Sequence, residues 1–190
     1  LSGDYVITAT QSEITYAMSS LAESSRLAPV VITPSNPYKT GDETLIWTIT
    51  KSGDNYTISQ GKNYLSWESD NSATTSTTPY ELVITKNKSE GTYQIASAAT
   101  PSRILAKNNT ANLGFGFYTG SQTKDLTLIP AEYVKLPEIT LDPSTLTLSY
   151  NDTETHYIPV TLKNAETQDV SVAIYDGTEG TEQPDWITTS

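Results

Sequence analysis

The sequence predicts a closed, all-β fold built from three related units. A short phrase recurs three times, as Tyr5-Val6-Ile7, Tyr56-Thr57-Ile58 and Tyr93-Gln94-Ile95. A second apolar phrase closes each unit, at residues 45–49, 80–84 and 125–128. Both phrases alternate apolar and polar residues, as half-buried strands do. Their repetition over units of about forty residues predicts a barrel with pseudo-threefold symmetry.

Each unit offers four short strands, which predicts about twelve strands in all. The first unit has candidates at 5–7, 14–18, 29–32 and 45–49, and the second at 56–58, 64–67, 69–78 and 80–84. The third unit has them at 93–95, 103–106, 113–118 and 126–128. Turn signals such as Ser52-Gly53-Asp54 separate the strands. The first unit is longer than the second, and we expect the excess in two loops, 19–27 and 35–43.

The repeats also match in register. Trp47, Leu82 and Leu126 occupy equivalent places, as do Ile49, Ile84 and Leu128. Because side chains of a strand alternate between its two faces, the members of each set can point into one shared core.

Composition agrees with this fold class and excludes several others. Hydrophobic residues make up 36% of the chain, with 12 Tyr against 2 Phe, and no long 3.6-residue periodicity is present. Tyr and Thr suit strands with one wet face. The chain has no Cys, which excludes disulfides and Cys-ligated zinc. No apolar run is long enough to predict a membrane span.

Charge marks a boundary near residue 132. The net charge of −11 disfavours nucleic acid as a partner, because phosphate binding depends on clustered Lys and Arg. Residues 1–132 carry 12 acidic and 9 basic residues, whereas residues 133–190 carry 10 acidic and 2 basic ones. We therefore predict two domains, 1–132 and 133–190.

Three units of four strands resemble the β-trefoil, as in ricin-B-type lectins. The resemblance covers about residues 1–132 and depends on the layout of the repeats. The Gln-x-Trp signature of ricin-type repeats is absent, and Ile46-Trp47-Thr48 is the nearest approach to it. Residues 117–132 also resemble modules of secreted, multi-domain surface proteins of gut bacteria. The resemblance implies carbohydrate binding, an extracellular or cell-surface location and further domains in the same polypeptide.

The second domain reads as part of an immunoglobulin-like sandwich. New alternation appears at 146–150, 157–162 and 170–174, and Pro184-Asp185-Trp186-Ile187-Thr188 resembles the closing strand of BACON-type modules. A complete sandwich needs about seven strands over ~100 residues. Residues 137–190 are too few for that, so we expect an incomplete sandwich.

Catalytic chemistry finds no support. His156 is the single histidine and lies on a predicted strand without a partner for a triad or a metal site. Glu68 and Asp70 are flanked by Ser and Asn, which indicates a solvated loop and not a catalytic carboxylate pair. No calcium-loop motif is present, and Gly114 and Gly116 do not complete a dinucleotide fingerprint. The sequence therefore predicts no enzyme activity, no cofactor and no metal.

Aromatic residues beside polar ones are the better candidates for a site, because saccharides stack on rings while nearby polar groups bond their hydroxyls. One candidate set is Trp67 with Glu68, Asp70 and Asn71, and a second is Tyr118 with Lys107, Asn108 and Asn109. Because Phe117 and Tyr118 are adjacent, we expect one of them to leave the core face of the strand. The competing interpretation is that these aromatic rings are core, as we expect for Trp47 and Trp186.

The sequence thus predicts a non-catalytic carbohydrate-binding module of a secreted or surface-anchored bacterial protein, accessory to a larger polypeptide. One or two glycan subsites are expected, in the second and third units. The alternative is a structural spacer or adhesin stalk component with no small-molecule ligand.

Overall fold

The computed structural model describes residues 1–87, 91–110, 113–135, 138–141 and 160–163. The chain divides into two compact units, Leu1–Val134 and Lys135–Ser190. The one helix in the described part is a short 3-10 turn, and every other regular element is a strand. No helix among these residues has the length and hydropathy of a membrane span.

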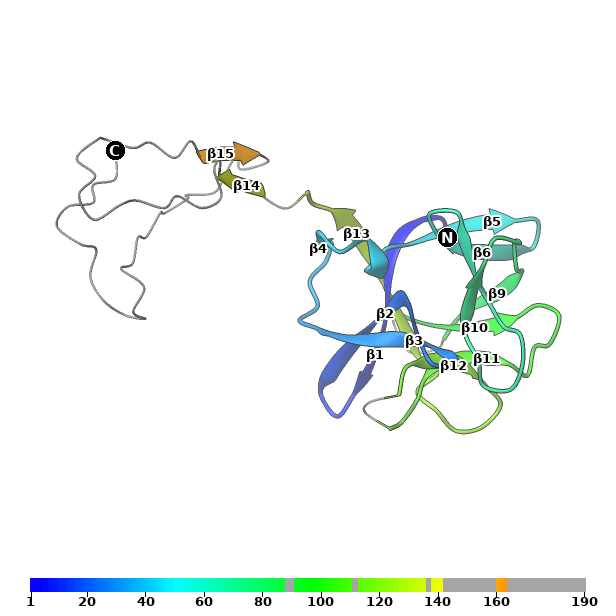
Figure 1. Ribbon diagram of the computed structural model, residues 1–190. Helices are drawn as coiled ribbons and strands as arrows, with labels where there is room; N and C mark the ends of the chain where they lie inside the picture. Colours follow the sequence, from blue (N-terminus) through cyan, green and yellow to red (C-terminus); the bar gives the residue numbers. More distant parts are fainter. Residues whose placement is uncertain (88–90, 111–112, 136–137, 142–159, 164–190) are drawn as a thin grey trace, which may run out of the picture. The chain divides into compact units, whose positions relative to one another are not determined.

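Six strands of the first unit close into a barrel. They are β1 (Gly3–Gln11), β5 (Trp47–Ser52), β6 (Asn55–Gln60), β9 (Leu82–Lys86), β10 (Thr92–Ser97) and β13 (Leu126–Tyr133). Each strand pairs antiparallel with the next in that order, and β13 pairs with β1 to close the ring. Figure 1 shows the successive strands running from blue through green to yellow around the barrel.

Three hairpins form a cap on the barrel. They are β2 (Ile14–Glu23) with β3 (Arg26–Ile32), β7 (Asn63–Ser66) with β8 (Thr74–Ser76), and β11 (Ile104–Lys107) with β12 (Phe115–Tyr118). The first and third hairpins join where Leu27 pairs with Phe115. Four strands from each of three units make the β-trefoil, and this prediction is confirmed.

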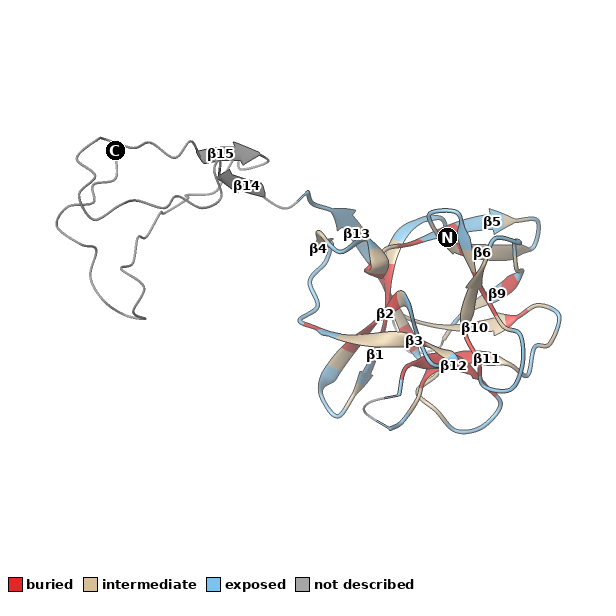
Figure 2. Ribbon diagram, in the orientation of Figure 1, coloured by how far each residue is buried: buried red, intermediate tan, exposed pale blue. Residues whose placement is uncertain are grey.

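The barrel core consists of the residues that the repeats match. Ile7, Ile58 and Ile95 are fully buried, and so are Trp47, Leu82 and Leu126. Figure 2 shows the buried stretches of the strands in red. The Trp47 indole N–H donates to the carbonyl of Met18 at 2.8 Å, so this large side chain is buried without losing its hydrogen bond. The expectation that Trp47 belongs to the core is confirmed.

The predicted loop at 19–27 is instead a hairpin. Strand β2 continues to Glu23, β3 begins at Arg26, and the register shifts between Met18 and Ala22. Residues 21–25 all lie exposed, so neither face of this part of the hairpin needs apolar side chains. The segment therefore lacks the apolar alternation by which a strand is predicted. The irregularity accommodates two extra residues on β2 without ending the pairing.

The second predicted loop forms part of an insertion, which we define as residues 33–46. It carries β4 (Tyr38–Thr40) and the 3-10 turn η1 (Glu43–Leu45), in which the Asp42 side chain accepts the Thr44 N–H. Leu45 is buried against Val6, Ala17 and Ile32, with Tyr38 packed beside them. The insertion thus builds a second, smaller core on the outer side of β1 to β3.

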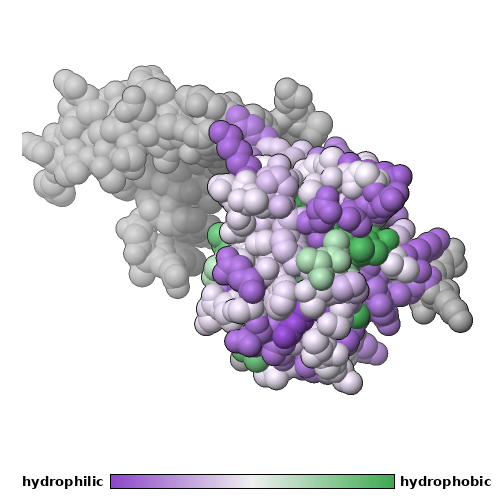
Figure 3. Space-filling model, turned by 90° about the vertical axis from the view of Figure 1, so that its right-hand side faces the viewer, coloured by the Kyte–Doolittle hydropathy of each residue, from purple (hydrophilic) through white to green (hydrophobic). Residues whose placement is uncertain are grey.

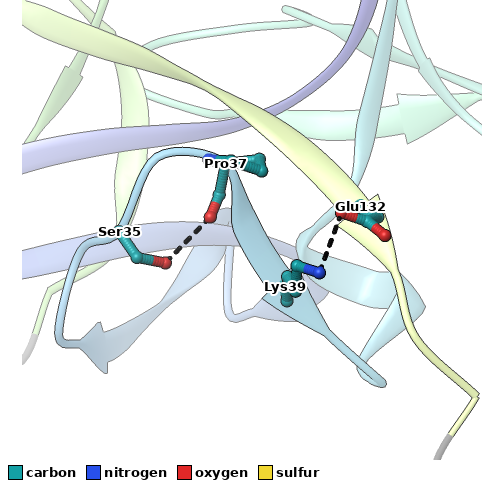
Figure 4. A network of polar contacts seen from close by, with 4 residues as sticks. All are labelled: Ser35, Pro37, Lys39 and Glu132. Carbon is teal, nitrogen blue, oxygen red and sulfur yellow. Dashed lines mark hydrogen bonds and ion pairs between the residues drawn. The ribbon is translucent and has the colours of Figure 1, made fainter.

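The same insertion pairs with the last barrel strand. β4 runs parallel to β13 from Tyr38 opposite Ala131 to Thr40 opposite Tyr133. Figure 4 shows Lys39 paired with Glu132 at 3.4 Å and the Ser35 hydroxyl donating to the Pro37 carbonyl at 3.0 Å. The ion pair is well exposed, so its contribution to stability is small.

The described part of the second unit is one antiparallel pair, β14 (Glu138–Leu141) with β15 (Val160–Lys163). The other predicted strands, His156 and Trp186 lie outside the described residues. The immunoglobulin-like domain at 133–190 therefore stays a prediction.

Candidate functional site

The second-unit candidates lie on a loop between β7 and β8, residues 67–73, which we call the cap loop. Its backbone is fixed from within. The Ser72 hydroxyl accepts the N–H groups of Glu68 at 3.4 Å and Ser69 at 3.2 Å, and the Ser72 N–H donates to the Ser69 carbonyl at 3.0 Å. Asp70 completes the turn in the left-handed region, with φ at +44°. Short polar side chains of this kind stabilise tight turns by bonding nearby backbone groups.

The cap loop is also held by the other two units. Ala73 donates its N–H to the carbonyl of Ser25 in the first unit at 3.0 Å, and Ser72 accepts the N–H of Phe117 from the third at 3.1 Å. Gly116 lies so close to the Asn71 carbonyl oxygen that a Cβ at position 116 would overlap it. The loop therefore sits where the three cap hairpins meet, and its residues are placed before any ligand arrives.

Trp67 is half-buried and shares its environment with Arg103, a residue that the sequence did not suggest. The Arg103 guanidinium carbon lies 5.0 Å from the indole centroid, within the range of a cation–π contact. The indole N–H donates to the Asp70 carbonyl at 3.0 Å. Arg103 Nη1 donates to the same carbonyl at 2.5 Å and to Asn71 Oδ1 at 3.3 Å.

No local pattern could have indicated Arg103, because it precedes β11 in a different unit. Only the fold brings it over the indole. It covers one face of the Trp67 ring, so the expectation of a bare stacking platform has to be revised. A ligand at the cap loop would therefore meet an indole that has a guanidinium over one of its faces.

Several polar groups at the cap loop keep free hydrogen-bonding capacity. The Glu68 and Asp70 side chains are exposed, and no described residue donates to either carboxylate. The Asn71 side-chain nitrogen likewise has no acceptor among the described residues, since its hydrogen bond with Arg103 uses the oxygen. Strong acceptors and donors thus stand beside an aromatic ring, which is the composition of a saccharide site.

The third-unit candidates are placed differently, because the aromatic ring that leaves the core face is nevertheless buried. Phe117 is 0% and Tyr118 3% exposed, so neither leaves the interior. Phe117 points into the barrel core, whereas Tyr118 points to the opposite face of β12 and is covered there. Its hydroxyl accepts from Arg26 Nε at 2.7 Å and from Asn108 Nδ2 at 3.2 Å. Tyr118 therefore cannot stack on a ligand in this structure.

Lys107 is also inside the protein. Its ammonium lies 4.6 Å from the centroid of the Tyr16 ring and donates to the carbonyls of Asn108 at 2.9 Å and Thr110 at 3.2 Å. Burial lowers the pKa of the Lys107 ammonium from its ordinary value, and the negative charge of Glu23 opposes this in part. Contact between Lys107 and a surface ligand would require the loop above it to open.

Asn108 and Asn109 are bonded to their own surroundings. Asn108 Oδ1 accepts the Thr110 N–H at 2.8 Å, and its carbonyl accepts from Gln11 Nε2 at 2.9 Å. Asn109 donates its N–H to Gln122 Oε1 at 2.8 Å and its side-chain amide to the Ser121 carbonyl at 3.2 Å. These bonds join the end of β1 to two loops of the third unit. The structure thus gathers Trp67, Glu68, Asp70 and Asn71 at one place, and it uses the third-unit set as internal support.

The described residues offer no cluster of His, Cys, Asp and Glu side chains able to hold a metal ion. The visible face in Figure 3 is mostly hydrophilic, with small separate hydrophobic spots. At the cap loop itself, the described groups available to a ligand are the polar side chains and the Trp67 ring.

Comparisons with known proteins bear on the fold. No family model and no curated protein matches the sequence. Among solved structures, the chain is similar to a mosquitocidal holotoxin, with a TM-score of 0.52, 16% identity and coverage of 74% of this chain and 19% of the other. It is similar to a GlcNAcα1-4Gal-releasing endo-β-galactosidase from Clostridium perfringens, with a TM-score of 0.52, 12% identity and coverage of 68% and 33%.

A third similar structure is the ricin B-like lectin of Macrolepiota procera, solved in complex with lactose, with a TM-score of 0.50, 16% identity and coverage of 67% and 94%. At these identities the likeness extends to the fold. The chain spans about a fifth of the holotoxin and a third of the galactosidase.

Proposed function

We propose that this chain is a non-catalytic carbohydrate-binding module and that it binds saccharides at the cap loop. The observation that carries the proposal is the fixed cap loop itself. Within a few residues it holds a half-buried indole, two carboxylates that accept no bond from described residues, and an amide that keeps its donors. Saccharide hydroxyls both donate and accept, so a rigid set of acceptors and donors beside an apolar ring matches their chemistry.

The module would serve a secreted or surface-anchored bacterial protein as an accessory to further domains. The resemblance of residues 117–132 to modules of such proteins motivates this part. The solved proteins in which a similar fold makes up 19% or 33% of a longer chain are consistent with an accessory role. The ricin B-like lectin solved with lactose supports a glycan as the ligand of such a fold, through likeness of fold alone.

A glycan array probed with the full chain tests the proposal. We expect binding to a small group of related saccharides, with Kd in the millimolar to high-micromolar range, because one ring and a few exposed hydrogen bonds yield about 4–6 kcal/mol. Absence of saccharide binding at high protein concentration would contradict it.

Asp70→Asn then locates the site. The carboxylate is exposed, and the structure uses only the carbonyl of this residue, so folding should be unaffected. Losing a charge-assisted hydrogen bond should weaken saccharide binding by roughly tenfold or more, measured by calorimetric titration. The matched control is Asp54→Asn, in the exposed turn between β5 and β6, which should bind like the unmodified chain. Equal affinities of the two variants for the saccharide would show that the binding site is not at the cap loop.

A structural spacer is the competing function. It is favoured by the absence of a bare aromatic platform, since Tyr118 is buried and Arg103 covers one face of Trp67. As a spacer, the chain would bind no saccharide, and Asp70→Asn would have no effect on any ligand.

A further inference from the structure

The chain contains two arginines, Arg26 and Arg103, and the fold brings both to the cap. They come from different units and are 77 positions apart in the sequence. Both are half-buried, in an otherwise acidic protein with a net charge of −11.

Each guanidinium is fixed against an aromatic ring. The Arg103 guanidinium lies 5.0 Å from the centroid of Trp67, and that of Arg26 lies 5.9 Å from the centroid of Tyr118. Arg103 Nη1 bonds the Asp70 carbonyl, and Arg26 Nε donates to the Tyr118 hydroxyl at 2.7 Å. An arginine held in this way loses little side-chain freedom when it binds a further group.

Both side chains retain donors. Among the described residues, the two terminal nitrogens of Arg26 and the Nε and Nη2 of Arg103 have no acceptor. No described carboxylate lies within 4.0 Å of either guanidinium, and the single ion pair in this part of the chain joins Lys39 to Glu132. Each arginine therefore carries a positive charge that no close carboxylate balances.

Both arginines are connected to the surroundings of Asn71, Arg103 directly and Arg26 through Tyr118. On β12, Phe115 and Phe117 point into the core, so Gly116 and Tyr118 point to the outer face of the cap. The Asn71 carbonyl packs directly on Gly116, beside the Tyr118 ring that Arg26 contacts, and the Asn71 side chain bonds Arg103. Asn71 thus contacts Arg103 directly and lies beside the Tyr118 ring that holds Arg26.

We infer that the cap-loop site recognises a saccharide that carries a carboxylate, with Arg103 and Arg26 as the residues that select it. The inference rests on the proposed function and names its ligand class. The guanidinium fork matches a planar carboxylate with two parallel hydrogen bonds, which an ammonium cannot do. A neutral saccharide carries no negative charge, so two arginines at its site would bring it no charge-assisted hydrogen bond to a carboxylate.

Three carboxylates oppose an acidic ligand: Glu68 and Asp70 on the cap loop, and Glu23, which pairs across the turn with Arg26. All three side chains are exposed, so their repulsion is screened by salt, as is the attraction of the arginines. The preference for an acidic saccharide is therefore expected to be moderate. The preference depends more on the directed hydrogen bonds of the two guanidinium groups than on the net charge of the protein.

The test compares a short oligomer of galacturonic acid with the same oligomer after its carboxylates have been reduced to primary alcohols. Calorimetric titration with the full chain should give about tenfold tighter binding of the acidic form. Arg103→Gln and Arg26→Gln should each reduce that ratio toward one, and Arg103→Lys should restore only part of it. Lys51→Gln, which removes the same charge from an exposed position on β5, should leave the ratio unchanged. Thermal unfolding of each variant verifies its fold.

Equal binding of the two oligomers would overturn the inference and leave the carbohydrate-binding function intact. A ratio that falls equally in Lys51→Gln would also overturn it, since the preference would then follow net charge. If neither oligomer nor any arrayed glycan binds, the inference fails together with the proposed function.

Discussion

Lys107 is a charged residue placed where water cannot reach it, and this placement has a consequence for pH dependence. Burial lowers the pKa of its ammonium below 10.5 in the folded chain. Between the lowered value and 10.5 the unfolded chain binds a proton that the folded chain does not. The contribution of Lys107 to stability is therefore lowest below the folded-state pKa and rises as the pH increases through this window.

We predict this rise in a comparison of the unmodified chain with Lys107→Met. Methionine fills a similar volume without a titrating group. Urea unfolding at about pH 7 and again near pH 10.5 gives the stability difference between the two chains at each pH. The difference should shift in favour of the unmodified chain as the pH rises, because the lysine then loses the charge whose burial is unfavourable. A difference that is constant or falls would show that Lys107 is not desolvated.

At the residue scale, sequence reasoning succeeded where a side chain follows local geometry. Trp67 comes directly after a strand, and its loop neighbours Glu68 and Asp70 are exposed as expected. It did not succeed for Tyr118, because both faces of β12 are covered and alternation therefore does not expose either of two adjacent aromatics. Sequence patterns also could not indicate Arg103, because its contact with Trp67 forms only when the third unit packs against the second.

Among the elements, the insertion at 33–46 departs furthest from a simple repeat, and its packing can be measured. Leu45 is 3% exposed against Val6, Ala17 and Ile32, so Leu45→Ala should lower the free energy of unfolding by about 2–4 kcal/mol. Urea denaturation measures this. The control is Leu21→Ala, at a position that is 60% exposed on β2, where a change within about 0.5 kcal/mol is expected. Similar small losses in both variants would mean that the insertion is not a packed part of the fold.

The strands were predicted from apolar alternation, and strand segments without this alternation were therefore predicted to be loops. Residues 19–27 read as a loop because their side chains are mostly exposed and polar, yet their backbone groups still pair across the β2–β3 hairpin. Residues 35–43 contain a three-residue strand that is too short to show any period. Backbone pairing without a buried face leaves little trace in a sequence.

At the scale of the whole molecule, the fold could be predicted because the sequence repeats three times. Ile7, Ile58 and Ile95 occupy the same place in three units, and this equivalence predicts a shared core without any knowledge of the hairpins. The site does not follow the repeats. It combines the cap loop of one unit with arginines from the other two, so each unit contributes different residues and no pattern within a unit could reveal it.

The indole N–H signals of the tryptophans provide the most direct test of the cap-loop site. The chain has 3 Trp, and Trp67 is the one at the cap loop, while Trp47 is buried in the barrel with its N–H bonded to Met18. In a ¹⁵N-labelled full chain titrated with a saccharide chosen from the array, we predict a saturable shift of the Trp67 indole signal, assigned with Trp67→Phe. The Trp47 signal should stay in place. Saturable binding that leaves the Trp67 signal unmoved would contradict a saccharide site at the cap loop.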